Sequence, residues 1–182
     1  MKRILRSSSY IAAVRVGDDQ LYLISELLEP PSDPMQVAVS TLTLSTFVAW
    51  IYSAELENVV RHHPGVTGFF PRNDAFNALG MLANHLLHPN NRETLQSVIK
   101  YHLLDEILYS HKIKGREQLH PTLQGSFLSI DKGKAGNVSA TSRGYFANMT
   151  RNRDLLCSNG VLHEMTRVMM PPNLEVSIVS GP

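Results

Sequence analysis

The sequence predicts a globular domain of the α+β class, and three observations support this prediction. Between about residues 40 and 103, apolar residues recur at three- and four-residue steps, the spacing of helices with one buried face. From residue 107 onward, short alternating runs are separated by turn residues, which is typical of β-strands. The 182 residues are 43% hydrophobic and 18% charged, enough for one domain with a core, or one domain plus a fragment. Helices followed by strands indicate the α+β class.

The first 35 residues are predicted to be extended. Residues 20–28 (QLYLISELL) are rich in aromatic and branched side chains, and residues 29–31 (EPP) end this strand. Residues 32–34 (SDP) are expected to form a loop. The basic start at residues 1–6 is followed by too short an apolar run for a signal peptide. No run approaches the ~18 apolar residues of a membrane span, so any anchor of the parent protein is expected outside this segment.

The helical half is expected to begin with a long helix and a buried strand. The helix should start at Ser40 or Thr41 and end after residues 57–60. Its apolar face consists of Leu44, Phe47, Val48, Ile51 and Ala54. A short strand follows at residues 66–70, and Pro71 ends it.

Two further helices are expected before the β half. A short helix should run through residues 77–79, with Asn73 or Asp74 accepting its free N–H groups and Gly80 at its end. A second helix follows residues 89–91 (PNN). One face of it carries Leu95, Val98, Ile99, His102 and Leu103.

The β half is expected to consist of short strands. They are predicted at residues 127–130 and 137–140 on either side of a turn, and then at 145–149, 154–157 and 161–165. Asn159 and Gly160 are expected to make the tight turn between the last two.

Charge and motifs argue against nucleic-acid binding and catalysis. The 17 basic and 16 acidic residues are scattered, whereas a nucleic-acid interface gathers basic residues on one face. Residues 125–127 (GSF) do not form a Gly-x-Ser-x-Gly elbow, and residues 133–136 (GKAG) lack the spacing of a phosphate loop. Cys157 stands alone, so it forms no intrachain disulfide and is interpreted as a structural thiol. Neither an enzyme activity nor a cofactor is predicted.

The eight histidines predict no metal site. His85 and His88 are three apart, but no carboxylate or thiol accompanies them, and zinc needs three or four ligands. His62 and His63 precede Pro64-Gly65 and are expected in an exposed turn. His102 and His163 are interpreted as core histidines, whose ring nitrogens need partners inside the protein.

Two triplets match the acceptor sequence for N-glycosylation, beginning at Asn137 (NVS) and Asn148 (NMT). Both fall in the turn-rich β half, where exposure is expected. Glycosylation at these sites would suit an extracellular or luminal protein.

The chain contains an internal repeat. Residues 18–31 (DDQLYLISELLEPP) resemble residues 159–172 (NGVLHEMTRVMMPP) at an offset of 141 residues, position 31 matching 172. A period of this length indicates repeated domains rather than solenoid units. The alternative is that two unrelated strands both end in Pro-Pro.

Three stretches, in the right order, resemble the signatures of the fasciclin domain family. Residues 67–76 (TGFFPRNDAF) resemble the first motif, Thr-Val-Phe-Ala-Pro-Thr-Asn-Asp-Ala-Phe, and residues 100–102 (KYH) resemble the central Tyr-His motif. Residues 158–172 (SNGVLHEMTRVMMPP) resemble the second motif, Asn-Gly-Val-Ile-His running to Leu-Leu-Pro-Pro. Residues 44–47 (LSTF) look like the opening of the family's first helix, and the resemblance spans about 38–176.

The chain also departs from the family pattern. Gly68 replaces a branched residue, Phe70 replaces Ala, and Arg72 replaces a small hydroxyl residue. Thr166 stands where Asp is common. These changes put in doubt partner contacts that depend on the usual surface around the first motif.

The resemblance implies a fasciclin-type fold, a compact β wedge of short strands with several helices packed against it. It favours residues 1–35 as the tail strand and linker of a preceding domain, and residues 36–182 as a complete domain. It implies a non-enzymatic adhesion module at a cell surface, in matrix, or in a secretory or vacuolar lumen, with a parent that is membrane-anchored or secreted. The implied partners are proteins, integrin-like or a second copy, and glycans.

The resemblance also implies the residues of contact. A partner would meet Tyr101, His102 and the neighbouring loops, with avidity from tandem copies. The alternative is a carbohydrate- or lipid-binding domain. Tyr109 and Tyr145 are the candidates for stacking on a sugar, whereas Trp50 is expected in the core.

Overall fold

The chain divides into two compact units, residues 1–31 and 32–182, of which the computed structural model describes residues 10–25 and 29–174. The first unit is an antiparallel hairpin of β1 (Tyr10–Val16) and β2 (Asp19–Ile24). The strand predicted at residues 20–28 is confirmed as far as Ile24, and residues 26–28 lie outside the described part. Gly17, with φ +63°, lies in the turn, where a residue without Cβ takes the left-handed conformation at little cost.

The second unit contains the helices and the two larger sheets. Its α-helices are α1 (Pro34–Val39), α2 (Ser45–Ser53), α3 (Glu57–His62), α4 (Met81–Leu86) and α5 (Arg92–Tyr101). Its 3-10 helices are η1 (Leu42–Leu44), η2 (Asn73–Leu79) and η3 (Pro89–Asn91). Its strands are β3 (Val66–Pro71), β4 (Leu103–Leu104), β5 (Gln118–Pro121), β6 (Phe127–Lys132), β7 (Val138–Ser142), β8 (Tyr145–Asn148), β9 (Leu155–Cys157) and β10 (Gly160–Met165).

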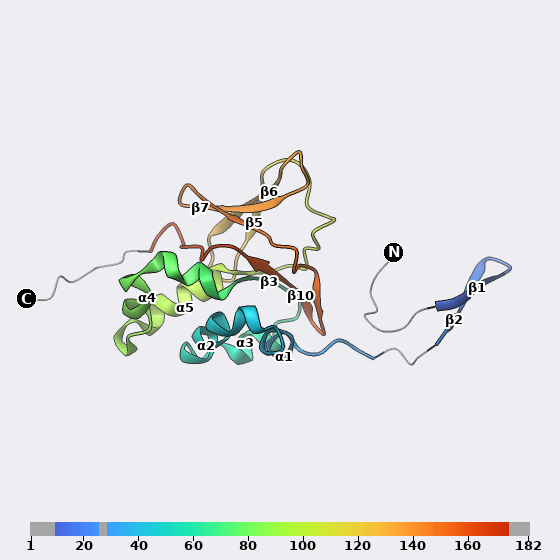
Figure 1. The fold of residues 1–182 in the computed structure, drawn as a ribbon, viewed down its shortest axis with the longest axis horizontal. Coiled ribbons are helices and arrows are strands. Elements are labelled where there is room, and N and C mark those ends of the chain that lie inside the picture. The colour runs from blue at the N-terminus through green and yellow to red at the C-terminus, as the bar shows by residue number, and fades with distance from the viewer. Residues whose placement is uncertain (1–9, 26–28, 175–182) are drawn as a thin grey trace, which may run out of the picture. The chain divides into compact units, whose positions relative to one another are not determined.

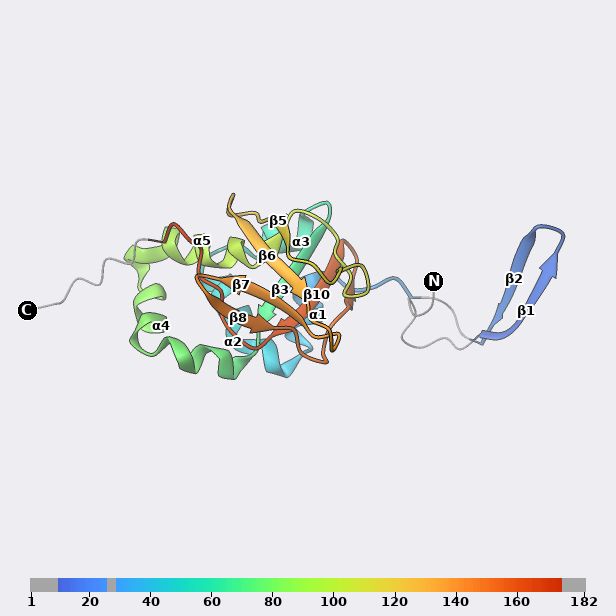
Figure 2. The same ribbon diagram turned by 90° about the horizontal axis from the view of Figure 1, so that it is seen from above.

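These strands form two four-stranded sheets, in the orders β4-β3-β10-β9 and β5-β6-β7-β8. Strands β3 and β10 run parallel, Val66 beside Gly160, and the other pairs are antiparallel. In the second unit, the β3–β10 sheet lies between the helices and the β5–β8 sheet (Figure 1). Seen from above, β5–β8 covers β3 and β10 (Figure 2).

Each face of the middle sheet contributes to its own hydrophobic core. Val66 and Phe70 pack with the helices, where the Phe70 and Phe47 rings meet edge to face at 4.8 Å. Phe69 points to the opposite side and packs with the inward residues of β5–β8, such as Leu128 and Ile130. The six residues of β3 are all buried, as expected for a strand covered on both faces.

The Asn-Gly pair before β10 joins three elements. The Asn159 side-chain amide donates to the carbonyls of Val60, Arg61 and His63, closing the end of α3. A Cβ on Gly160 would lie 1.8 Å from the Val66 carbonyl oxygen, so only glycine lets β10 approach β3 this closely. The predicted turn is shifted by one residue, since Ser158 and Asn159 form it and Gly160 begins the strand.

Three local predictions need correction. The loop predicted at residues 32–34 is confirmed for Ser32 and Asp33, but Pro34 already begins α1, because Asp33 accepts from the N–H groups of Met35 and Gln36 and caps that helix. The long helix expected from residue 40 is divided into η1, α2 and α3, and Glu55 takes a φ of +56° at the break. Asn73 caps another helix than expected: its side-chain oxygen accepts from the Thr46 N–H at 2.9 Å, within the first turn of α2.

Candidate binding surfaces

His102, a candidate for partner contact, is fully buried at the end of α5. Its Nδ1 lies 2.8 Å from the Val98 carbonyl oxygen, and its Nε2 accepts from the Met169 N–H at 2.9 Å. An accepting Nε2 places the proton on Nδ1, so the ring is neutral and ties α5 to the segment after β10. Burial lowers the pKa of His102 to about 4.

Tyr101, the second candidate, is also buried, with 3% of its surface exposed. Its hydroxyl donates to the Phe127 carbonyl oxygen at 3.4 Å, and burial raises the pKa of this hydroxyl. The apolar face of α5 turns both side chains inward, so neither offers surface to a partner in this structure. Any contact with this region would involve residues around Tyr101 and His102.

The structure confirms the prediction that His163 is a core histidine. It is fully buried on β10, and its ring stacks on Phe69 with 5.5 Å between centroids. Its Nε2 donates to the Leu108 carbonyl oxygen at 2.9 Å, and its Nδ1 accepts from the Asp154 N–H at 3.1 Å. Burial lowers the pKa of His163.

Two further candidates for chemistry, Cys157 and the pair of His120 and Glu106, do not form a nucleophile–base pair in the described part of the chain. Burial raises the pKa of the Cys157 thiol to about 12, which keeps it protonated at neutral pH. His120 Nδ1 lies 2.5 Å from Glu106 Oε1, a pair that sequence reasoning missed, but neither residue bonds to a serine or cysteine within the described ranges. The same part of the chain has no group of three or more metal-ligating residues and no helix long and apolar enough to cross a membrane.

The outward side of the β5–β8 sheet, called the outer face below, exposes three large apolar side chains. Leu119, Phe127 and Phe146 are 66%, 60% and 60% exposed. Ser129 and Thr141 lie between Leu119 and Phe146 in one register row across the sheet, and Phe127 shares a face with Ser129 because it is two residues away on β6. The alternate residues point into the core.

Both predicted glycosylation asparagines are exposed. Asn137 lies immediately before β7, at the β6–β7 turn, and its carbonyl accepts from the Gly133 N–H at 2.8 Å. Asn148 lies on β8 two residues after Phe146, so it belongs to the outer face. The sequence predicted exposure at both positions, and the structure confirms it.

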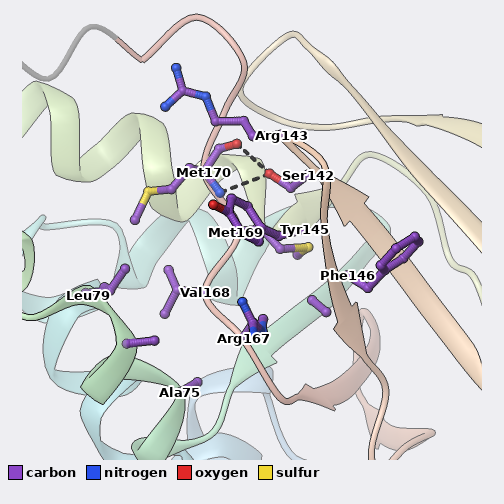
Figure 3. A pocket seen from close by; sticks show the side chains of 12 residues that line it. Ala75, Leu79, Ser142, Arg143, Tyr145, Phe146, Arg167, Val168, Met169 and Met170 are labelled. Atoms are coloured by element: carbon purple, nitrogen blue, oxygen red, sulfur yellow. Dashed lines mark hydrogen bonds between the residues drawn. The ribbon is translucent and has the colours of Figure 1, made fainter.

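A groove of about 350 Å³ lies beside the opposite side of β8 (Figure 3). Strand alternation directs Tyr145 over the groove, whereas Phe146 borders the groove with its ring turned outward. The apolar part of the lining comes from η2, from β8 and from the segment after β10, namely Ala75, Ala78, Leu79, Phe146, Ala147, Val168, Met169 and Met170. Tyr145, a sequence candidate for ligand stacking, is thus 67% exposed at a real concavity.

The other aromatic candidates lie elsewhere. Tyr109 is half-buried and stacks on His111 at 5.7 Å, away from the residues that line the groove. Trp50 is 2% exposed and packs against Phe76, which confirms its place in the core.

Comparisons with known proteins agree with this fold. The sequence profile described as "Fasciclin domain" matches residues 42–171. The chain is 32% identical over 153 residues to transforming growth factor-beta-induced protein ig-h3 of Sus scrofa, covering 84% of this chain and 21% of that protein. It is 30% identical over 139 residues to protein sll1483 of Synechocystis, covering 76% of this chain and 73% of that protein.

Two further relatives bear on the organisation of the chain. Fasciclin-like arabinogalactan protein 15 of Arabidopsis thaliana is 30% identical over 122 residues, 66% of this chain and 26% of that protein. A solved structure of a FAS1 domain pair from the insect cell adhesion molecule fasciclin I covers 92% of this chain and 60% of that one, with a TM-score of 0.66 at 18% identity. The chain thus spans about a fifth to a quarter of two of these relatives, and most of the cyanobacterial one.

The family profile covers most of the second unit and contains the motifs at residues 67–76 and 100–102 and nearly all of the one at 158–172. The α+β fold predicted from the sequence is that of the solved fasciclin structure. The chain belongs to the fasciclin domain family.

Proposed function

We propose that this chain is a non-enzymatic, protein-binding module of a larger adhesion protein, and that it meets its partner through the outer face. The observation that supports this proposal is the exposure of Leu119, Phe127 and Phe146 on one side of one sheet. Exposed apolar side chains that cluster on a face often mark protein interaction sites, because contact with a partner removes them from water. The solved relative is described as a cell adhesion molecule.

The partner is proposed to be a cell-surface protein of the integrin kind or a second copy of the domain. Ser129 and Thr141 place hydroxyl groups between the apolar side chains, which matches the mixture of apolar anchors and hydrogen bonds in protein interfaces. Tandem copies in a parent protein would add avidity.

Cell attachment to surfaces coated with the domain tests this proposal. The double variant Phe127→Ser/Phe146→Ser should lower attachment at least tenfold while its thermal unfolding stays unchanged, because both side chains are exposed. Met81→Ser, at an 86% exposed position on α4, is the matched control. Sedimentation at high concentration separates self-association from binding to a cell-surface protein. Undiminished attachment of the double variant would refute contact through the outer face.

We also propose that residues 1–31 are the end of a preceding fasciclin domain. The β1–β2 hairpin turns between Val16 and Asp19, and the β9–β10 hairpin turns between Cys157 and Gly160. Both positions are related by the same 141-residue offset as the sequence repeat. Because the two hairpins turn at equivalent positions of the repeat, the repeat is better explained by two copies of one structural unit than by a chance match of two strands that end in Pro-Pro.

An extracellular or luminal location is proposed from the exposed sequons. Expressed through a secretory pathway, the domain should gain glycan mass at Asn137, at Asn148 or at both. Mass spectrometry of the Asn137→Gln and Asn148→Gln variants would assign the site. A glycan-free product from such a host would remove this support for the location.

One observation favours carbohydrate or lipid binding as a second candidate function. The groove of Figure 3 places an exposed tyrosine beside apolar side chains and arginine.

A further inference from the structure

We infer that the groove is a binding site for a small anionic amphiphile, a free carboxylate on an unbranched apolar chain. The groove combines apolar walls from η2 and residues 168–170 with two arginines, Arg143 and Arg167, and none of its lining residues is acidic. A carboxylate needs the cation, and an alkyl chain needs the walls. Arginine is the side chain best suited to a carboxylate, because its planar fork donates two parallel hydrogen bonds.

Arg167 is the cation available to a ligand. It is exposed, and no ion pair joins it to a carboxylate anywhere in residues 10–25 or 29–174. Its guanidinium lies 5.8 Å from the centre of the Tyr145 ring, a cation–π contact that holds it at the groove.

Arg143 is engaged elsewhere. One of its nitrogens donates to the carbonyls of Pro172 and Leu174, both at 3.3 Å, and so anchors the segment that follows the groove. In Figure 3 its guanidinium points away from Leu79 and Val168. Arg143 therefore contributes charge at the rim, and Arg167 is the residue placed to bind the carboxylate.

The apolar part of the groove suits a narrow, flexible chain. Its volume of about 350 Å³ is at the small end of the ~300–1,000 Å³ typical of ligand pockets. Met169 and Met170 are unbranched and adapt to different shapes, while Ala75 and Ala78 leave room beside Leu79.

A neutral sugar is a poorer match. Ser142 and Tyr145 carry the hydroxyl groups of the lining. The Ser142 hydroxyl donates to the Met170 carbonyl at 2.6 Å and accepts from the Met170 N–H at 3.1 Å (Figure 3). Its hydrogen-bonding capacity is therefore largely used. On the side formed by methionine, valine and leucine, the hydroxyl groups of a sugar would be buried against side chains that offer them no hydrogen bond, which is unfavourable.

Isothermal titration of the whole chain with three ten-carbon probes tests the assignment: decanoate, decanol and decyltrimethylammonium. Decanoate should bind most tightly. Arg167→Gln should weaken decanoate at least fivefold and leave decanol within twofold, because only the charged contact is lost. Arg116→Gln, an exposed arginine outside the groove lining, should change neither. Ala78→Trp should abolish binding by filling the groove, while its thermal unfolding shows that the domain is intact.

Several results would overturn the inference. Equal binding of the three probes would show an unspecific apolar surface, and full decanoate binding by Ala78→Trp would place the site elsewhere. Binding only to vesicles of anionic phospholipid, or only to an acidic peptide, would assign the groove to a membrane or to a protein. Phe146 borders both the groove and the outer face, but Phe127 and Leu119 do not line the groove, and Arg167 is not one of the outer-face residues. Phe127→Ser and Arg167→Gln therefore test the proposed adhesion surface and this site separately.

Discussion

At the scale of single residues, two buried histidines connect distant segments of the fold. His102 links α5 to the Met169 backbone, and His163 links β10 to the Leu108 and Asp154 backbones. Each neutral ring uses one nitrogen as donor and the other as acceptor, which leaves no proton position free for catalysis. In this chain the histidines of the Tyr-His and Asn-Gly-Val-Leu-His motifs therefore have a structural role, since both are fully buried and hydrogen-bonded inside the domain.

The pKa of His102 predicts a loss of stability in mild acid. The unfolded chain binds a proton near the ordinary pKa of 6.5, whereas the folded chain excludes it until about pH 4. The stabilisation that the neutral His102 ring gives to the folded state is fully present above pH 6.5 and is lost progressively as the pH falls to about 4. Over this window the free energy of unfolding should decrease by about 3 kcal/mol from His102 alone, with His163 acting in the same direction.

Urea unfolding at several pH values between 4 and 7 measures this dependence. The His102→Gln variant should be less stable at pH 7, because glutamine fills the space of the ring incompletely and disturbs the hydrogen bond to the Met169 N–H. Its free energy of unfolding should also depend less steeply on pH. His62→Gln, an exposed control, should keep the full slope. A slope that survives in His102→Gln would assign the acid sensitivity to other groups.

Two departures from the family motif compensate each other. A Cβ on Gly68 would lie 2.6 Å from Cε1 of Phe70 and 2.6 Å from Cδ2 of Leu162. The larger ring at position 70 thus occupies the space that a branched residue at position 68 would need, since the two residues share one face of β3. The sequence showed the two changes, but their coupling depends on the rotamer of Phe70.

A double-mutant cycle tests this compensation. Gly68→Val should destabilise by overpacking, and Phe70→Ala should cost ~3–5 kcal/mol by leaving a cavity. The double variant should recover at least about 1 kcal/mol relative to the sum of the two losses. Gly68→Val/Phe69→Ala is the matched control, because Phe69 packs on the opposite side of the sheet and should show a smaller coupling. Strict additivity of positions 68 and 70 would contradict the explanation.

At the scale of elements, the parallel pairing of β3 and β10 organises the domain. It brings the first and last family motifs side by side, with Phe69 beside His163 and Val66 beside Gly160. The close approach at Gly160 makes this pairing sensitive to a single methyl group.

Gly160→Ala should therefore disrupt the middle sheet. The added Cβ would meet the Val66 carbonyl oxygen at 1.8 Å, and backbone atoms of a central strand have little freedom to move. We expect a loss on the order of 3 kcal/mol or more, or failure to fold, measured by thermal unfolding and circular dichroism. Gly133→Ala is the control, because the nearest atom to its Cβ would be 3.7 Å away. A Gly160→Ala protein of normal stability would show that the strands pair less closely.

The elements also show how far the sequence could predict this fold. The periodicity of residues 92–101 identified α5, and alternation identified β6 and β7, because these patterns depend on local contacts. The short helix α1 was missed because its capping residues, Asp33 and Pro34, are also typical of loops. The breaks among η1, α2 and α3 depend on packing, which a one-dimensional pattern does not contain.

The candidate surfaces were less predictable than the elements. Alternation in residues 127–130 predicted a strand, but the pairing of β6, β7 and β8 was needed to place Phe146 on the same face as Phe127. Tyr145 was identified as an exposed aromatic, whereas the walls opposite it come from η2 and from the segment after β10. Tyr101 and His102 lie inside because the apolar face of α5 includes them.

At the scale of the whole molecule, the two units differ in how much apolar surface they bury. The residues of the two hydrophobic cores all belong to the second unit, between Met35 and Leu174. In the β1–β2 hairpin, Val14, Leu21 and Leu23 share one face and are 57%, 61% and 59% exposed. Isolated two-stranded hairpins are marginally stable in water, which is consistent with a hairpin that belongs to a larger fold.

The boundary between the two units lies between Pro31 and Ser32, earlier in the chain than the boundary after residue 35 that the sequence suggested. The Ser32 carbonyl accepts from the Ser158 N–H at 2.9 Å. Asp33 caps α1 and forms an ion pair with Arg61 at 2.9 Å. Residues 32 and 33 are therefore part of the second unit.

Two truncations test this division. If the hairpin is the end of a preceding domain, removal of residues 1–31 should leave the thermal unfolding of the remainder unchanged. Removal of residues 1–33 should lower the free energy of unfolding by about 1–2 kcal/mol, because the α1 cap is lost. In the protein that begins at Ser32, Asp33→Ala should reproduce most of that loss. Unfolding of the protein that begins at Ser32 would show that β1 and β2 belong to this domain and would refute the tandem arrangement. If the proteins that lack residues 1–31 and 1–33 were equally stable, Asp33 would not stabilise the second unit, and the boundary would lie after it.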